Sequence, residues 1–263
     1  MKYIGENLFP GDTYDTPETN RARLGSKIFG RWYFYWHNFN IFSQTGRCGQ
    51  RGELDGNAQI FYSNQNFQLI ERCGGRAHIR GLDILRKHKG PAVYLGNHMS
   101  LLETAVLHAI LRPHHDFTFV IKESLMKIPH FRDIMTATRA ITIGRSNPKE
   151  DLKIVLTEGK ERLESGQSVM IFPQGTRTAV FDPAHFSSIG VKLAKTAGVP
   201  VIPVALKTDF LGNGKIIRDL GPMHPEKDVW FAFGEPMEIT GNGKDQQQQV
   251  VDFIQKNLES WNK

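Results

Sequence analysis

The sequence is poor in cysteine and has no long apolar run. Cys48 and Cys73 are its only cysteines, and they match neither a zinc site nor a CxxC redox motif, so we expect two reduced thiols rather than a bridge. No run of about 18 apolar residues occurs, and a spanning helix is therefore not expected. The beginning, MKYIGENLFPGDTYDTPE, has acids and prolines where a signal peptide has a basic start and an apolar stretch. We expect a cytoplasmic protein.

Motifs of several common α/β enzymes are also missing. No G-x-S-x-G elbow supplies a hydrolase nucleophile, and no G-x-G-x-x-G opens a helix to bind a dinucleotide. FPQGTR is not a phosphate-binding Walker loop, because no Gly-Lys-Ser/Thr follows it. His114-His115-Asp116 lacks a partner at ligand spacing. The chain is therefore expected to hold no metal and no resident cofactor.

Positive charge is concentrated in the N-terminal third. The formal net charge is +6, of which residues 1–90 carry +5 and residues 91–263 carry +1. Such an excess suggests contact with an anionic surface. No nucleic-acid recognition motif accompanies it, so we expect no nucleic-acid partner.

Aromatic residues are also concentrated near the N-terminus. Eight of the fourteen residues from Phe29 to Phe42 are aromatic, and basic residues lie beside them. Rings with basic flanks suit the headgroup boundary of a bilayer, but they could equally pack on the domain core. We divide the chain into a polar arm at 1–20, an aromatic and basic membrane-interface region at 21–72, and an α/β domain at 73–263.

Strands and helices alternate from about residue 76. Short apolar strands are expected near 76–82, 92–97, 117–122, 139–145, 168–175, 199–206 and 228–237. Amphipathic helices are expected at 100–111, 148–166, 187–198 and 245–262, after an earlier one at 58–72. This order predicts an α/β fold with a mixed, largely parallel central sheet and helices on both faces, preceded by an N-terminal helical segment.

The stretch YLGNHMSLLETAVL, residues 94–107, combines a helix start with a possible catalytic pair. Ser100 followed by Glu103 is a capping-box pattern that could explain both residues structurally. A cap at Ser100 also leaves His98 on the preceding loop, where Glu103 could accept a hydrogen bond from one imidazole nitrogen and leave the other free as a base. In α/β folds, the carboxyl end of a strand is where sites occur.

A second candidate site lies in VMIFPQGTRT, residues 169–178. A glycine turn after a strand can offer amides to an anion, and Arg177 could grip a phosphate. A surface turn with a solvated arginine is the alternative.

Four blocks between residue 76 and about residue 206, NHMSLLE, AITIGR, FPQGTR and GVPVIPVAL, occur in the order of the glycerolipid acyltransferase motifs. The chain resembles that superfamily, and its lysophosphatidate acyltransferases in particular. The family's first motif is Asn-His, four residues and Asp, where this chain has Glu103 in the Asp place. Its third is Phe-Pro-Glu-Gly-Thr-Arg, where this chain has Gln174. Some branches of the superfamily use Glu at the first of these positions.

The resemblance implies that a fatty acyl group moves from acyl-CoA or acyl carrier protein to a lysophospholipid hydroxyl. His98 would be the general base and Glu103 would orient it. The implied substrate-binding residues are Asn97, Arg145, Gln174, Gly175, Thr176 and Arg177. The enzyme would work as a peripheral protein at the inner face of the membrane. Acylation of another lyso-lipid, such as a lyso-aminolipid, and a non-catalytic lipid-binding role stay open as alternatives.

Overall fold

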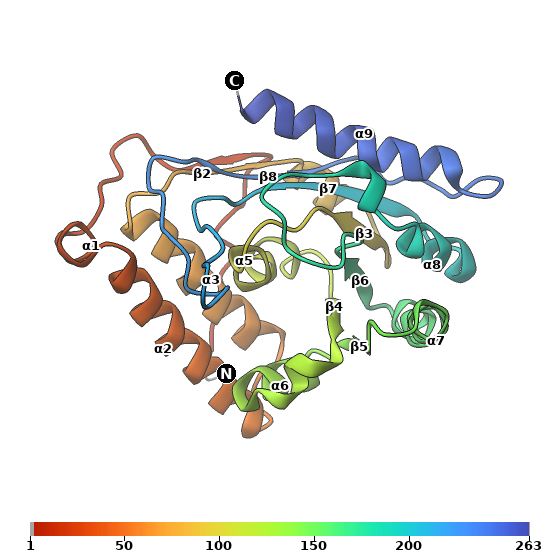
Figure 1. The fold of residues 1–263 in the computed structure, drawn as a ribbon, viewed down its shortest axis with the longest axis horizontal. Helices are drawn as coiled ribbons and strands as arrows, with labels where there is room; N and C mark the ends of the chain where they lie inside the picture. The colour runs from red at the N-terminus through yellow and green to blue at the C-terminus, as the bar shows by residue number, and fades with distance from the viewer. Residues whose placement is uncertain (1–2, 263) are drawn as a thin grey trace.

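The computed structural model describes residues 3–262 and contains an eight-stranded sheet with helices on both faces (Figure 1). The strand order is β1-β2-β8-β7-β3-β6-β4-β5. The strands are β1 (Tyr14–Asp15), β2 (Ala77–Arg80), β3 (Val93–Gly96), β4 (Phe117–Lys122), β5 (Ile141–Ile143), β6 (Ser168–Ile171), β7 (Val201–Lys207) and β8 (Val229–Phe233). The pairs β7–β3, β3–β6, β6–β4 and β4–β5 are parallel, as is β2–β8, whereas β7–β8 and β1–β2 are antiparallel. The mixed, largely parallel α/β sheet predicted from the sequence is confirmed.

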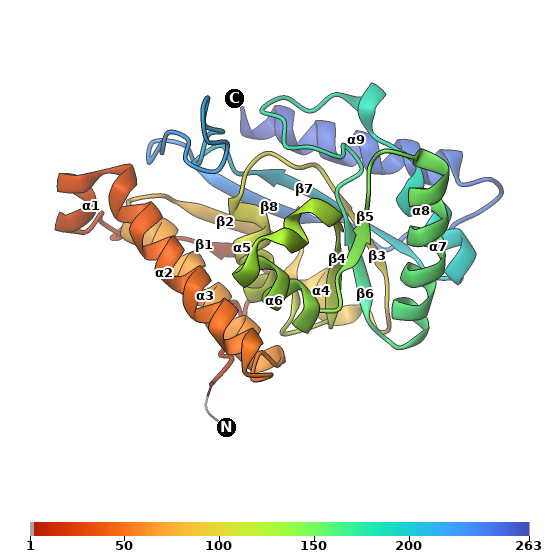
Figure 2. The same cartoon turned by 60° about the horizontal axis from the view of Figure 1, so that its bottom comes forward.

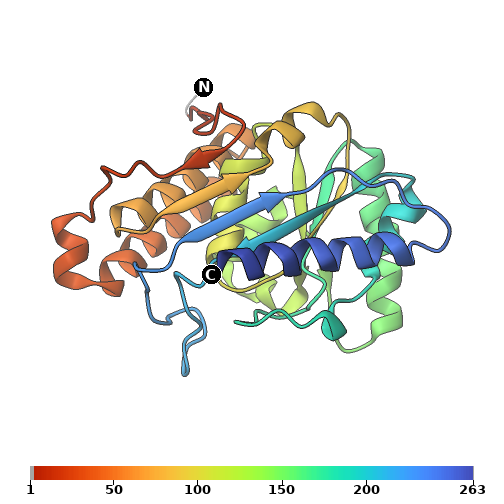
Figure 3. The ribbon, with the colours of Figure 1, turned by 90° about the horizontal axis from the view of Figure 1, so that it is seen from above.

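Helices surround this sheet in two layers. The α-helices are α1 (Leu24–Phe29), α2 (Arg31–Gln50), α3 (Gly56–Arg72), α4 (Leu82–Lys87), α5 (Leu102–Leu111), α6 (Pro129–Ala137), α7 (Pro148–Glu164), α8 (Ile189–Ala197) and α9 (Lys244–Trp261), with 3-10 turns at Glu123–Lys127 and Pro183–His185. On one side α3 packs on α5, and α2 packs outside against α3 and α6 (Figure 2). On the other side α7 packs on α8, and α9 crosses β7 (Figure 3).

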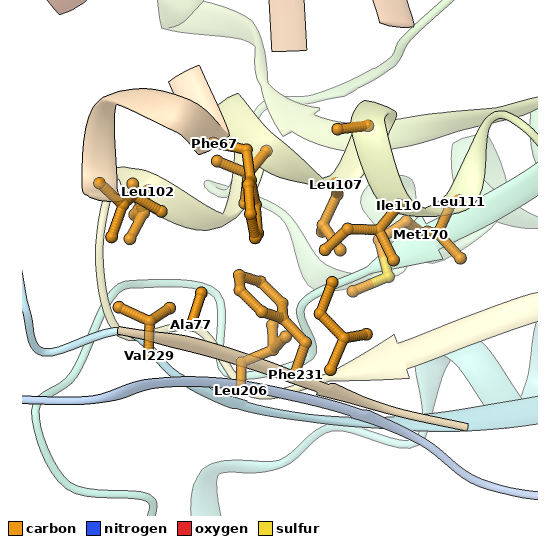
Figure 4. Packing of buried hydrophobic residues seen from close by; sticks show 14 of the residues in the cluster. Phe67, Ala77, Leu102, Leu107, Ile110, Leu111, Met170, Leu206, Val229 and Phe231 are labelled. Carbon is orange, nitrogen blue, oxygen red and sulfur yellow. The ribbon is translucent and has the colours of Figure 1, made fainter. Parts of the chain in front are cut away.

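The alternation of side chains along each strand produces two apolar layers. Tyr94 and Leu206 point into the layer shared with α3 and α5, whereas Leu95 and Ala205 point into the layer shared with α7, α8 and α9. Figure 4 shows Phe67 of α3 above this sheet in the first layer. Burial on both faces explains why the strands read as continuous apolar runs rather than as alternating patterns.

Residues 3–20, expected as a polar arm, pack on the domain. Phe9 is buried and its ring contacts Phe67 edge-on at 4.7 Å. Tyr14 and Asp15 form β1, which pairs with β2 and is itself an edge strand of the sheet. The first apolar layer therefore receives residues from the arm, from the aromatic segment and from the α/β region together. Residues 1, 2 and 263 of the expected divisions lie outside the described residues.

The aromatic segment has two faces, one packed on the domain core and one exposed. Phe34 and Tyr35 are buried against the domain, as the core alternative requires. Trp32 and Trp36 lie on the outer side of α2, where Trp36 is 74% exposed. Their spacing of four residues puts them on one side of the helix.

Large apolar side chains are exposed along α1 and α2, and we name this set the α1–α2 apolar face. It consists of Leu24, Ile28, Phe29, Trp32, Trp36 and Phe39, all exposed. Soluble domains rarely expose so many large apolar side chains together, and such patches mark interaction surfaces. Between residues 3 and 262, no helix has both the length and the apolar character needed to cross a bilayer.

Candidate active site

The first site element is the turn between β3 and α5, which is fixed to the neighbouring strand by Asn97. The buried Asn97 amide donates to the carbonyl of Leu206 at 2.7 Å and accepts from the Leu206 N–H at 2.8 Å. Both side-chain polar groups are thereby used inside the protein. The structure thus gives Asn97 the role of holding the turn to β7, which differs from the substrate contact expected of its side chain.

His98 and Glu103 form the pair that the sequence suggested. The imidazole Nδ1 of His98 is hydrogen-bonded to Oε2 of Glu103. The Glu103 side chain is 0% exposed and that of His98 is 19% exposed. Within residues 3–262, His98 Nε2 makes no hydrogen bond to another protein group, so this nitrogen is available to a substrate. A carboxylate on Nδ1 and a free Nε2 are the arrangement of an oriented general base.

The two oxygens of Glu103 have different partners. Oε1 accepts from the N–H groups of Met99 and Ser100, at 2.8 and 3.0 Å, and also from the hydroxyl of Thr208. Oε2 is left for His98. A buried carboxylate is costly unless it is hydrogen-bonded, and here four donors surround it.

The capping interaction occurs in a modified form. Glu103 accepts from the Ser100 N–H, which is one half of a capping box. The Ser100 hydroxyl accepts from the N–H of Leu102 at 3.1 Å, and α5 begins at Leu102 instead of Ser100. The same carboxylate therefore closes the helix start and orients His98, so the structural and the chemical interpretations of Glu103 are compatible.

The second site element, the loop after β6, holds His98 from the other side. The Phe172 ring stacks on the His98 imidazole with centroids 4.3 Å apart and planes inclined by 11°. The Gln174 side-chain oxygen accepts from the His98 N–H at 2.8 Å, and its amide donates to the Thr178 hydroxyl at 2.6 Å. The Thr178 N–H in turn donates to the His98 carbonyl at 2.9 Å. Position 174 therefore requires a side chain that accepts from His98 and donates to Thr178, and the glutamine amide does both.

Arg145 reaches the same loop from β5. Its guanidinium donates to the carbonyl of Gly175, so two sequence blocks separated by 30 residues meet. The Arg145 backbone has φ +63°, a left-handed conformation that costs a non-glycine residue free energy. Asp151 in the first turn of α7 stabilises it by accepting from the N–H groups of Gly144 and Arg145. Strain of this kind tends to occur at functional sites, where the surrounding contacts enforce it.

Gly175 and Thr176 form the turn that the sequence placed here. Gly175 has φ +71°, which a side chain would oppose, and its N–H closes the turn on the Phe172 carbonyl at 3.1 Å. Thr176 is exposed beside it.

Arg177 is paired within the protein. Its guanidinium donates to Asp219 at 2.5 Å, and its carbonyl accepts from the Arg218 guanidinium. Both partners belong to the chain between β7 and β8. Arg177 is therefore neither a freely solvated arginine nor an open anion site in this state.

Sequence reasoning missed four residues that shape the site, namely Thr208, Phe172, Asp151 and Asp219. Thr208 and Asp219 lie 105 and 42 residues from their partners, Glu103 and Arg177. Phe172 lies in VMIFPQGTRT, where its ring fits the apolar pattern of the expected strand. Asp151 had a usable signal, because an acid in the first turn of a helix often accepts from nearby amides.

A hollow beside α1 does not contain these residues. It has a volume of about 540 Å³ and lies at the start of α1, between Lys27, Arg31, Gly74 and Met223. None of the site residues lines it.

Fold and site together define an α/β protein whose sheet carries a histidine paired with a buried carboxylate, beside two arginines, at the carboxyl ends of β3, β5 and β6. Residues 76–207 match the model of the family described as Acyltransferase, which is half of the chain. The chain belongs to this acyltransferase family.

Several curated relatives carry the same description. A 1-acyl-sn-glycerol-3-phosphate acyltransferase of Pseudomonas aeruginosa is 38% identical over 133 residues, which is 51% of this chain and 50% of that protein. One of Haemophilus influenzae is 25% identical over 201 residues, 70% of this chain and 77% of that protein. The chain spans half or less of the first relatives, with 38% of an Arabidopsis thaliana protein covered.

One solved structure supports the fold over nearly the whole chain. The crystal structure of the 1-acyl-sn-glycerophosphate (LPA) acyltransferase PlsC of Thermotoga maritima superposes with a TM-score of 0.67. The match covers 89% of this chain and 95% of that one at 19% identity. At this identity the likeness concerns the fold alone.

Proposed function

We propose that the protein is an O-acyltransferase that moves a fatty acyl group from a thioester, acyl-CoA or acyl carrier protein, to the free hydroxyl of a lysophosphatidate-like acceptor. The observation that carries the proposal is the His98–Glu103 pair, with Nδ1 bound by a fully buried carboxylate and Nε2 open. Family membership and the names of the relatives support the reaction class.

The chemistry follows from the two nitrogens of His98. Nε2 takes the proton of the acceptor hydroxyl as its oxygen attacks the thioester carbonyl, and Glu103 stabilises the imidazolium that forms. The C–S bond then breaks, and the thiolate leaves with the proton that His98 returns. Because a thioester is already activated, no covalent acyl-enzyme is required.

Arg145 and Arg177 suit an acceptor that carries a phosphate. Arg145 donates to the Gly175 carbonyl, and Arg177 follows Thr176 in the same loop. One guanidinium group can bind two phosphate oxygens at once. Binding of the phosphate to Arg177 requires exchange with Asp219. Gln174 is engaged with His98 and Thr178, so its contribution to binding is positioning.

The α1–α2 apolar face suits contact with a membrane surface, where an acceptor with a fatty chain resides. Residues 19–52 contain six Lys or Arg and no Asp or Glu. Each basic residue near an anionic leaflet contributes about 1 kcal/mol, and tryptophan favours the headgroup level. We infer peripheral binding at the inner face.

The decisive test is turnover by the purified wild type and by the His98→Ala variant. Wild type should acylate lysophosphatidate, and the variant should be slower by about 10²–10⁴, since a positioned base contributes that much. The acceptor headgroup and the donor are then varied. Wild-type turnover in the His98→Ala variant contradicts the mechanism, whereas preference for a lyso-aminolipid over lysophosphatidate contradicts the proposed acceptor.

Membrane binding is tested with Trp32→Glu and Trp36→Glu. Co-sedimentation with anionic liposomes should fall while the melting temperature stays unchanged, because both rings are exposed. Wild-type binding should weaken with added salt. Full binding by both variants contradicts a role for this face.

A further inference from the structure

A second apolar surface lies at the tip of the chain between β7 and β8. Ile216 is 98% exposed, and Ile217 and Leu220 are exposed beside it. We name residues 213–221 the β7–β8 tip. Large apolar side chains at the end of a loop cost solubility and gain nothing from the fold, which suggests a partner surface.

The tip is a closed turn, not an open strand of chain. The Gly212 N–H donates to the Pro222 carbonyl at 2.9 Å, and the Gly214 N–H to the Arg218 carbonyl at 2.9 Å. A bridge between Leu211 and Met223 closes its base. These bonds hold Ile216 at the outer end, so its exposure is a property of the fold.

Two contacts tie the tip to the membrane-facing helix and to the catalytic turn. The Tyr35 hydroxyl of α2 donates to the Gly221 carbonyl at 3.1 Å in a buried contact. The Asn213 amide donates to the Met99 carbonyl, next to His98, at 3.0 Å. Figure 3 shows the tip projecting by itself, apart from α1. Because Tyr35 is a buried ring of α2, the base of the tip contacts the inward side of that helix.

The charges of the tip favour an anionic partner. Lys215 and Arg218 flank the isoleucines, and the only acid between 213 and 221 is Asp219. Asp219 is neutralised by its ion pair with Arg177. Apolar side chains with basic neighbours match the headgroup boundary of an anionic bilayer.

We propose that the β7–β8 tip is a second membrane-contact element, which inserts Ile216 and Ile217 into an anionic phospholipid bilayer in addition to the contact of the α1–α2 apolar face. The inference rests on the proposed function in supposing a bilayer-resident acceptor. Two separate contact elements restrict the tilt of the molecule on the bilayer, whereas one amphipathic face alone leaves it free to tilt.

The cysteine content of the chain permits a direct measurement. Cys48 and Cys73 are both buried, so an Ile216→Cys variant can be labelled at position 216 with an environment-sensitive thiol fluorophore. Ile4→Cys is the matched control, because Ile4 is 79% exposed but lies on the N-terminal arm, away from the tip. Vesicles of phosphatidylcholine and phosphatidylglycerol are added without any other protein.

We expect a blue shift and a rise in emission for the label at 216, and neither for the label at 4. A double Ile216→Asn/Ile217→Asn variant should bind the same vesicles about tenfold or more weakly, since two apolar side chains no longer enter the boundary. Its melting temperature should match that of the wild type, because neither side chain is in the core.

An unchanged spectrum at position 216 on vesicles that bind the protein overturns the proposal and points to a protein partner instead. A shift of equal size at position 4 also overturns it. Acyl transfer to a short-chain acceptor dissolved below its micellar concentration separates this result from failure of the proposed function. The rate of acyl transfer to this soluble acceptor should be equal in the wild type and the double variant. Absence of turnover in both proteins contradicts the enzyme assignment alone.

Discussion

Glu103→Gln separates the two roles of Glu103, because each oxygen of the carboxylate has its own task. Oε1 receives Met99, Ser100 and Thr208, and Oε2 receives only His98. A glutamine that keeps its oxygen among the three donors retains the whole structural set. The opposite orientation would set an NH₂ group against those donors, so the amide must point toward His98.

That orientation reverses the hydrogen bond to the imidazole. Nδ1 of His98 must then accept, and the neutral ring carries its proton on Nε2, the nitrogen needed as the base. The loss should approach that for a wrong tautomer or a missing base, about 10²–10⁴ in kcat, or roughly 3–5 kcal/mol in the barrier. It should be smaller than the loss in His98→Ala. The free energy of unfolding should fall by only about 1 kcal/mol, since charge-assisted bonds become neutral ones.

The assay is release of the free thiol from acyl-CoA under saturating acceptor, paired with thermal unfolding. Glu71→Gln serves as the control, because Glu71 also accepts two hydroxyls, from Tyr14 at 2.5 Å and Thr16 at 2.7 Å, but on α3. It should change stability without changing kcat. A Glu103→Gln enzyme with lowered stability and wild-type kcat would refute the reasoning and leave only the helix-capping role.

Thr208→Val should lower kcat by about tenfold with a small change in KM, because one donor that fixes Glu103 is lost. Thr208→Ser should recover most of the lost kcat, and equal losses in both variants would contradict a role for the hydroxyl. Asp219→Asn should lower KM for a phosphorylated acceptor by several-fold, since Arg177 no longer has to exchange a charged partner; steady-state kinetics in which KM rises would assign Asp219 to the acceptor site. Burial lowers the pKa of His108 well below 6.5, so the unfolded chain binds a proton in that range that the folded chain does not, and stability should fall as pH drops below about 6.5. His108→Gln should lose less melting temperature than wild type between pH 7.5 and 5, and equal losses would show that His108 has no part in the acid sensitivity.

Much of the fold follows from local patterns. The order of strands and helices from residue 76 was predictable because each strand is an apolar run and each helix is amphipathic. The direction of β8 was not, since its reversed pairing with β7 depends on contacts distant in sequence. Phe9 was also missed, because one aromatic ring in a polar segment forms no period that indicates burial.

The site was predictable in its chemistry but not in its supporting contacts. His98 and Glu103 could be paired because His98 lies just before the start of α5 and Glu103 lies in its first turn. The sequence indicated that Arg145 and Gly175 share a role in substrate binding, but it did not predict the hydrogen bond between them. Pairing of Arg177 with Asp219 leaves no local pattern, since the two residues come from separate loops. Side chains that position others are the least visible in a sequence, because any distant donor of the right length could serve.

The reversal of β8 against β7 has a consequence for how the protein can change. Two parallel neighbouring strands have to be joined by a long crossover, usually through a helix. Because β8 runs antiparallel to β7, residues 208–228 leave and re-enter the sheet at the same end, where His98 lies. Doubling the length of a flexible loop costs only about 0.6 kcal/mol in closure entropy. Thr208, Phe210 and Leu211 are buried and have to be kept, whereas insertions and exchanges within residues 213–221 should be tolerated by the sheet. Exchange of residues 213–221 between relatives should therefore alter selectivity for the acceptor headgroup without rebuilding the core.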